Sequence, residues 1–363
     1  MTSPFKKLYK KEQSKRNTNI KLVKHTANLF SLSFLFSQLA VPTLELFKPS
    51  KAVASTTYGS GATASGYYAT AVGEASGATG SLSTAVGAIS TASGTSSAAF
   101  GFSATASATN ATALGTNATA SAVGGSTAVG YSASASNIAA TALGANSSSS
   151  GYYSTAIGIN ASASGSNSIA IGQIANAASS NAIALGTNAI SNGSNATAIG
   201  TDSTASGSFS TASGYDSNAS GDYSTASGYK ANASSTNSIA LGTSANASGC
   251  GDSIAIGSIA TASGTYDSIA IGTGANASGN SATAIGDGAT ASGYYSTALG
   301  SASTASGGYS SASGYNAYSN GTNSIALGTN SSASGDYSTA SGYYANASGT
   351  NSIALGTNSS ASG

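Results

Sequence analysis

After residue 55 the chain repeats one short pattern of polar, small and apolar positions. Residues 351–356 give its clearest copy, Asn-Ser-Ile-Ala-Leu-Gly. The closing glycine recurs from Gly59 to Gly356 at intervals of 14 residues, with three intervals of 15. A single period kept over about 300 residues is typical of a stacked repeat protein and not of a mixed globular core.

Four positions of the repeat accept only very small side chains. The position two before the closing glycine is Ala in all 21 copies from Ala71 to Ala354. The position four before the glycine, and those three and five after it, hold only Ala or Ser. Residues two apart in a strand share a face. These positions therefore predict the lining of a narrow coil that excludes anything larger than a methyl or hydroxymethyl group.

The outward positions differ between the two halves of the repeat. From Val72 onward, the residue one before the glycine is Val, Leu, Ile or Phe, with four Ser exceptions, and the residue three before it is mainly Ile or Thr. The outward positions of the second half are polar, as in Thr91 and Ser93. A coil of 14 residues has room for two strands of about five residues and two turns, in which Gly, Asn and Asp tolerate positive φ. We expect positions one, three and five before the glycine to share the apolar face.

The three additional residues all fit one turn, after the second strand and before the next first strand, as at residues 249–252. A solenoid tolerates insertions of this kind. The resulting rod, roughly 100 Å long at about 4.8 Å per coil, would carry an apolar stripe far larger than a soluble monomer usually exposes. We therefore expect copies of the chain to cover the stripe around a cyclic axis.

The recurring Asn-Ser-Ile-Ala-Leu/Ile-Gly phrases at 167–172, 237–242, 323–328 and 351–356 resemble the YadA-like head of trimeric autotransporter adhesins. The resemblance covers residues 55–363 and implies an all-β, left-handed parallel β-roll that assembles as a homotrimer. The family's neck, stalk and membrane anchor have no counterpart here, and the chain stops within a repeat, which indicates a partial product. The predicted trimer interface consists of Ile169, Ile171, Ile183, Leu185, Ile239, Leu241, Ile254, Ile256, Ile269, Ile271, Ile325, Leu327, Ile353 and Leu355.

Residues 1–54 form a separate basic segment with ten of the chain's 11 Lys and Arg. An apolar stretch at 29–40 and the small residues at 52–54 predict a secretory signal peptide cleaved after Ala54, with cleavage after Ala40 as the alternative. A basic tail is the other interpretation of this segment. The apolar stretch is too short to span a bilayer comfortably.

From residue 55 onward there is one base, Lys230, against eight acids, so the net charge is 1 − 8 = −7. This balance argues against nucleic acid and anionic membrane surfaces as partners. The same range has no His and one cysteine, Cys250. We therefore expect no catalytic residues, no metal site and no cofactor. Cys250 is expected to be a free thiol at an exposed bend, the alternative being a single interchain bridge.

Aromatic residues accompany the four Ser exceptions on the apolar face. Each of these coils has an aromatic residue five before its glycine and Tyr directly after it. One interpretation is that the rings cap a polar, under-packed layer, and the other is that they form contact ladders at the coil edges. The four coils carry Ser213, Phe209 and Tyr215; Ser227, Tyr223 and Tyr229; Ser313, Tyr309 and Tyr315; and Ser341, Tyr337 and Tyr343.

The resemblance implies a cell-surface adhesin head that binds extracellular matrix proteins or other cells, or promotes autoaggregation. Its ligand-binding residues are not identified by the sequence. The alternative is a structural surface fibre without a dedicated ligand. An ice-binding solenoid is disfavoured because its array of Thr would not accommodate Ile190 or Tyr318.

Overall fold

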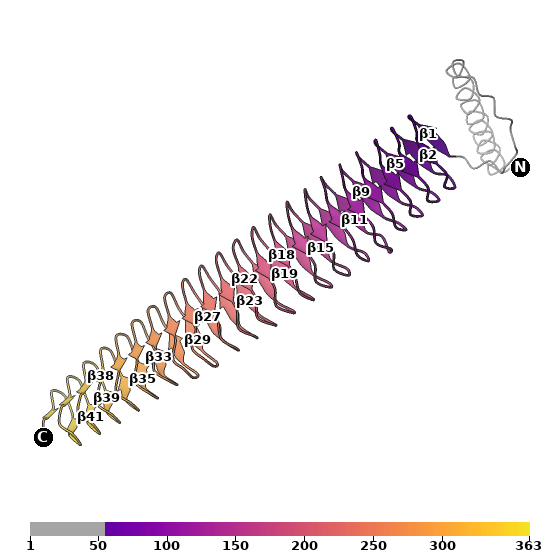
Figure 1. Cartoon of the computed structure of the whole chain (residues 1–363). Helices are drawn as coiled ribbons and strands as arrows, with labels where there is room; N and C mark the ends of the chain where they lie inside the picture. Colours follow the sequence, from indigo (N-terminus) through magenta and orange to yellow (C-terminus); the bar gives the residue numbers. More distant parts are fainter. Residues whose placement is uncertain (1–54) are drawn as a thin grey trace, which may run out of the picture. The chain divides into compact units, whose positions relative to one another are not determined.

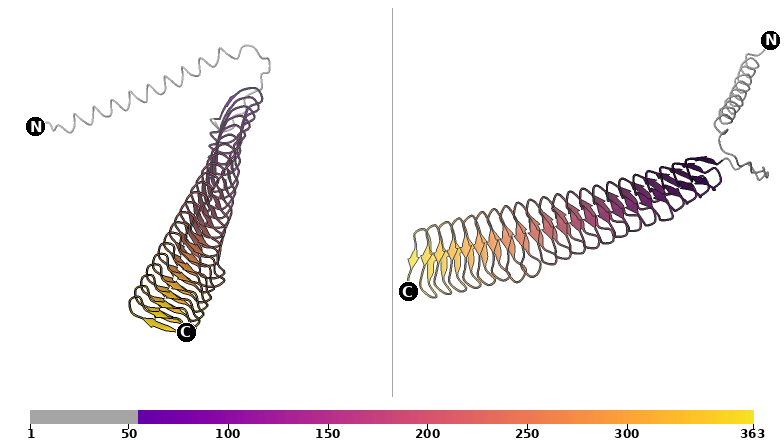
Figure 2. Two further views of the ribbon diagram at one scale, coloured as in Figure 1. Left: turned by 90° about the vertical axis from the view of Figure 1, so that its left-hand side faces the viewer. Right: turned by 45° about the horizontal axis from the view of Figure 1, so that its top comes forward.

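The computed structural model describes residues 55–363, which form one file of stacked coils (Figures 1 and 2). The predicted leader and both cleavage positions lie outside the described residues. Each coil contributes one strand to each of two sheets, and this range contains no helix. Accordingly, no helix in the described range has the length and apolarity needed to cross a membrane.

The first sheet, here called the apolar sheet, holds the odd-numbered strands, each three residues long. They are β1 (Thr56–Tyr58), β3 (Thr70–Val72), β5 (Thr84–Val86), β7 (Ala98–Phe100), β9 (Thr112–Leu114), β11 (Thr127–Val129), β13 (Thr141–Leu143), β15 (Thr155–Ile157), β17 (Ile169–Ile171), β19 (Ile183–Leu185), β21 (Thr197–Ile199), β23 (Thr211–Ser213), β25 (Thr225–Ser227), β27 (Ile239–Leu241), β29 (Ile254–Ile256), β31 (Ile269–Ile271), β33 (Thr283–Ile285), β35 (Thr297–Leu299), β37 (Ser311–Ser313), β39 (Ile325–Leu327), β41 (Thr339–Ser341) and β43 (Ile353–Leu355).

The second sheet, here called the polar sheet, holds the even-numbered strands, each two residues long. They are β2 (Thr63–Ala64), β4 (Gly77–Ala78), β6 (Thr91–Ala92), β8 (Thr105–Ala106), β10 (Thr119–Ala120), β12 (Ser134–Ala135), β14 (Ser148–Ser149), β16 (Ser162–Ala163), β18 (Asn176–Ala177), β20 (Ile190–Ser191), β22 (Thr204–Ala205), β24 (Asn218–Ala219), β26 (Asn232–Ala233), β28 (Asn246–Ala247), β30 (Thr261–Ala262), β32 (Asn276–Ala277), β34 (Thr290–Ala291), β36 (Thr304–Ala305), β38 (Tyr318–Ser319), β40 (Ser332–Ala333), β42 (Asn346–Ala347) and β44 (Ser360–Ala361).

Every strand pairs in parallel with the equivalent strand of the next coil, so identical columns of the repeat lie in register. Ala170 of β17 pairs with Ala184 of β19, and Ala163 of β16 pairs with Ala177 of β18. The ladder continues into the turns, where the N–H of Gly186 donates to the carbonyl of Ile171 at 2.8 Å. Each coil therefore satisfies its backbone groups through its two neighbours, as a solenoid requires.

The predicted small-residue lining is confirmed. The core consists of Ala side chains, nearly all of them fully buried, together with buried Ser. Ala170 and Ser168 of one strand segment are buried, as are Ala175 and Ala177 of the following one. The two sheets thus share one interior that is filled by methyl and hydroxymethyl groups alone.

The predicted strand length of about five residues is wrong, because two tight turns occupy more of each coil than expected. The turn that enters the apolar sheet, here called the entry edge, places the residue five before the closing glycine at positive φ, for example +56° at Asn181, except in the lengthened turns at Asp252 and Asp267. That residue therefore lies in the turn and not on the outer face shared by positions one and three. The turn that leaves the apolar sheet, here called the exit edge, likewise places Asn188 at +55°. Of the two central residues of such a turn only the second has positive φ, which is typical of type II turns.

The closing glycine is required on two grounds. Gly172 has φ +137°, a backbone conformation that side-chain-bearing residues rarely adopt, and an added Cβ would lie 2.3 Å from the carbonyl oxygen of Gly186. The coils approach each other too closely at this column for any other residue. The three inserted residues fall in the entry edges at 121–126, 248–253 and 263–268, as predicted.

Candidate interaction surfaces

The outer side of the apolar sheet, here called the apolar face, carries the side chains one and three residues before each closing glycine. All fourteen predicted interface residues lie on it. Their neighbours in the adjacent coils cover them in part, but Leu327 stays 51% exposed and Leu355 67% exposed. The rows formed by register pairs such as Ile171 with Leu185 extend along the rod. An apolar surface repeated over so many coils marks an interaction site.

Four serines interrupt these rows without breaking the sheet. Ser213 of β23 pairs in register with Ser227 of β25, so two polar layers lie directly one above the other. Ser313 and Ser341 form single polar layers. Ser313 lies between Leu299 and Leu327, and Ser341 lies between Leu327 and Leu355. All four serines are half-buried within the chain.

The outer side of the polar sheet, here called the polar face, is a surface of hydroxyls and amides. Asn218, Asn232 and Asn246 form a side-chain ladder in which each Nδ2 donates to the Oδ1 of the next coil, at 2.9 and 2.8 Å. Ile190 and Tyr318 occupy the same column. The predicted polar outer face is confirmed.

Aromatic rings lie on both edges of the rod and stack along it. On the entry edge Phe209 and Tyr223 stack with centroids 5.1 Å apart and parallel planes. On the exit edge Tyr215 and Tyr229 stack at 5.4 Å, and the Nζ of Lys230 lies 5.4 Å from the Tyr229 centroid. Each edge therefore carries a two-ring stack that spans successive coils.

A second ring cluster combines edge-on and stacked contacts at one entry edge. Tyr295 stacks on Tyr309 at 5.5 Å, and Tyr294 meets Tyr295 edge-on at 4.3 Å. The side-chain hydrogen bond with Tyr295 raises the pKa of Tyr294 above its ordinary value. Tyr294 is therefore a neutral hydrogen-bonding group throughout the physiological range.

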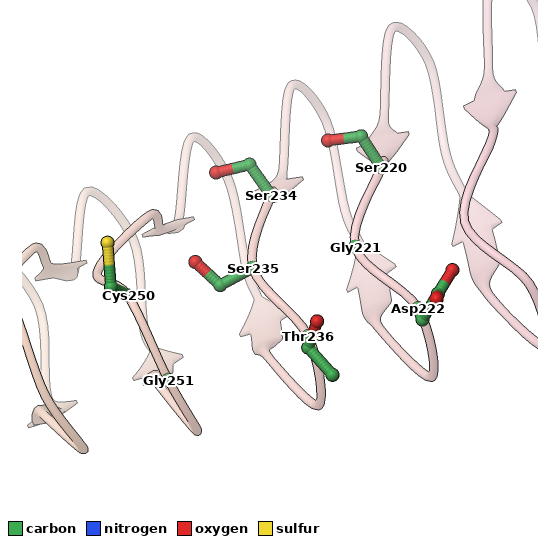
Figure 3. Close-up of a pocket in the computed structure, with 8 residues that line it drawn as sticks. All are labelled: Ser220, Gly221, Asp222, Ser234, Ser235, Thr236, Cys250 and Gly251. Carbon is green, nitrogen blue, oxygen red and sulfur yellow. The ribbon is translucent and has the colours of Figure 1, made fainter.

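Cys250 is exposed, as predicted, and lies beside an open hollow of about 490 Å³ on the entry edge. Figure 3 shows Ser220 and Ser234 in equivalent places on successive coils of this hollow, with Asp222 and Thr236 farther along their turns. The Asp222 carboxylate accepts a hydrogen bond from the N–H of Ser208 at 2.8 Å, so it caps the preceding coil. The described residues contain no cluster of three metal-ligating side chains.

These features define a class of protein: a parallel β-solenoid of short repeats with one apolar wall, one polar wall and aromatic edges. The chain matches the family model described as the YadA head domain repeat, two copies per match, from residue 78 to residue 363. It therefore belongs to the YadA head family, the surface-exposed part of trimeric autotransporter adhesins, which is not a family of enzymes. The matches cover residues 78–104, 92–118, 106–125, 124–147, 149–173, 163–189, 177–203, 191–217, 205–231, 219–245, 233–249, 251–275, 266–289, 291–317, 319–345 and 347–363. Comparison with curated proteins gives no match.

Proposed function

We propose that the chain is the head of a homotrimeric surface adhesin, which attaches cells to extracellular matrix proteins or to one another through many weak, repeated contacts. In this assembly the apolar faces of three copies meet at a common axis, and the polar faces remain in contact with the surroundings. A signal peptide within residues 1–54 directs the chain to the cell surface. The left-handed winding expected from the resemblance is part of the same proposal.

The observation that carries the proposal is the repetition of the same side-chain columns on every coil, in register along the whole described range. A ligand that contacts one coil finds equivalent groups about 4.8 Å further along the rod. The hollow beside Cys250 is open and polar, unlike the concave, mostly apolar sites that hold small molecules. Avidity from repeated contacts then supplies the affinity that a single coil lacks.

The test is a series of deletions that remove whole coils and keep the register. Deletion of residues 145–186 takes out three coils and joins Gly144 to Thr187, which is the residue that normally follows a closing glycine. The shortened protein should remain folded by circular dichroism and trimeric by sedimentation. Its binding to immobilised matrix proteins, and its self-association on cells, should fall roughly in step with the number of coils removed.

Two results would oppose the proposal. Abolition of binding by one substitution in one coil, with the fold intact, would show a localised site and not distributed contacts. Absence of binding to any matrix protein, to cells or to itself would favour a structural surface fibre.

A further inference from the structure

Four coils combine two departures from the common repeat that always occur together. Each has Ser one before its closing glycine, and each has an aromatic residue at both edges, five before the glycine and one after it. No other coil between Gly73 and Gly356 has aromatic residues at both of these positions. Tyr153, for example, stands with Ile157 on the apolar face and Ile159 at the exit edge. The association of serine with two rings therefore needs a common cause.

Contacts within one chain do not supply that cause. Phe209 lies in the turn before β23 and Tyr215 in the turn after it, so the two rings are on opposite edges with the strand of Ser213 between them. Their side chains contact rings of the next coil on the same edge, Tyr223 and Tyr229 respectively. The rings are also 49–59% exposed, which leaves about half of each aromatic surface for an outside partner.

In a ring of identical chains, neighbouring copies contact the apolar face and both edges of each chain at the same time. In a closed ring of identical subunits the interface is heterologous, so one edge of each copy lies against the opposite edge of its neighbour. When the apolar faces meet at the axis, the entry edge of one copy is therefore next to the exit edge of the next copy at the same level. A soluble ligand bound at an edge would give no reason for serine on the apolar face.

We propose that the paired rings are interchain clamps: Phe209 and Tyr223 of one copy pack against Tyr215 and Tyr229 of the neighbouring copy. They replace the apolar contact that is lost where Ser213 and Ser227 face the axis. The same arrangement applies to the single layers, with Tyr309 and Tyr315 beside Ser313 and Tyr337 and Tyr343 beside Ser341. Aromatic pairs contribute attraction beyond the area that they bury, and the Tyr hydroxyls keep access to water at the rim. This inference rests on the proposed homotrimer.

A mutant cycle on the purified full-length protein tests the clamp. One variant removes the entry-edge rings (Phe209→Ala, Tyr223→Ala), one removes the exit-edge rings (Tyr215→Ala, Tyr229→Ala), and one removes all four. We expect each variant to keep its β circular dichroism and to raise the concentration at which half of the chains are trimeric, by roughly tenfold or more. Removing all four rings should weaken the trimer little more than removing either pair, because each pair is the partner of the other.

Two further variants complete the cycle. Tyr153→Ala removes an edge ring from a coil without the serine, and should leave the trimer unchanged. Adding Ser213→Leu and Ser227→Leu to the four-ring variant converts the coils to the common apolar type and should restore trimer stability.

The results that would refute the interchain ring contacts differ from those that would refute the homotrimer. Unchanged trimer stability in the ring variants, or strictly additive losses without rescue by leucine, would show that the rings do not meet across chains. A wild-type chain that sediments as a monomer at all concentrations would instead refute the proposed trimer.

Crosslinking gives an independent measurement. In a Cys250→Ser background, Phe209→Cys combined with Tyr215→Cys should yield covalently linked trimers with a short bifunctional thiol reagent. Phe209→Cys combined with Asn218→Cys, which lies on the polar face, is the matched control and should stay monomeric in denaturing gels. Equal crosslinking of both pairs, or none of the first pair, would contradict the clamp.

Discussion

The apolar and polar sheets share an interior and a hydrogen-bonding scheme but differ in their outer faces. Ala170 on one sheet and Ala177 on the other are equally buried, and each pairs in register with an alanine of an adjacent coil, Ala184 and Ala163 respectively. Outside, the first sheet presents one row of mainly Ile, Leu and Val and a second row of Thr and Ile, whereas the second sheet presents Ser, Thr and Asn, with a ladder of Asn side chains. The comparison shows that the inward columns of the repeat determine the folding of the coil, whereas the outward columns determine what the rod can contact. Substitutions in the two kinds of column should therefore have separable effects.

The largest effect is expected in the shared interior, and it should be the same on either sheet. Ala170→Leu and Ala177→Leu each introduce a side chain for which the coil has no space, and neighbouring coils in register restrict any relaxation. Overpacking should cost at least ~1–3 kcal/mol and disrupt adjacent coils. Melting followed by circular dichroism measures the loss. Asn176→Leu is the control: it points outward from the polar sheet, in the column where Ile190 occurs naturally, and should be tolerated.

The sequence predicts the interior columns, the apolar and polar faces and the position of the insertions because these follow from size and period alone. It does not predict where each strand ends. Asn181 could continue a strand or occupy a turn, and only the backbone shows that it has positive φ. The stacking of Phe209 on Tyr223 depends on the register of successive turns, which a list of residues does not contain. For the same reason the sequence pattern overestimates the strand length and places the position five before the glycine on the apolar face, although it lies in the turn.

A negative charge should have different effects on the two outer faces. Ile239→Asp places a carboxylate on the apolar face, and in a trimer three such charges would meet in a region of low dielectric. We expect loss of the trimer in sedimentation while the coil stays folded. Asn246→Asp puts the same charge on the polar face and should leave assembly unchanged, since its Oδ1 already acts as an acceptor for Asn232. An intact trimer for Ile239→Asp would refute the axial assignment of this face.

A smaller effect is expected at the exit edge, where Ile174 adopts φ +60° and is 49% exposed. A β-branched residue is strained in this region, whereas Asn, which occupies the column at Asn160, tolerates it. Ile174→Asn should therefore raise the free energy of unfolding by about 1 kcal/mol, and Asn160→Ile should lower it by a similar amount. Thermal melts of the two variants give the comparison. A lower melting temperature for Ile174→Asn would show that an interchain contact of the isoleucine outweighs its backbone strain.

The smallest effects are expected from replacing buried serines with alanine, and they should differ between the two edges. All eight serines three residues after a closing glycine donate their hydroxyl to the carbonyl of that glycine, as Ser217 does to Gly214 at 3.0 Å. Of the fifteen serines four residues before a closing glycine from Ser83 to Ser352, nine, including Ser210, have a buried hydroxyl without a hydrogen-bond partner. Ser217→Ala should destabilise the protein by about 1 kcal/mol, because it removes a net-favourable buried hydrogen bond. Ser210→Ala removes only an unpaired polar group and should be neutral or stabilising. Equal losses in urea unfolding would show that the Ser210 hydroxyl bonds to the carbonyl of Gly207, as that of Ser83 does to Gly80 at 2.6 Å, and that the two edges are equivalent.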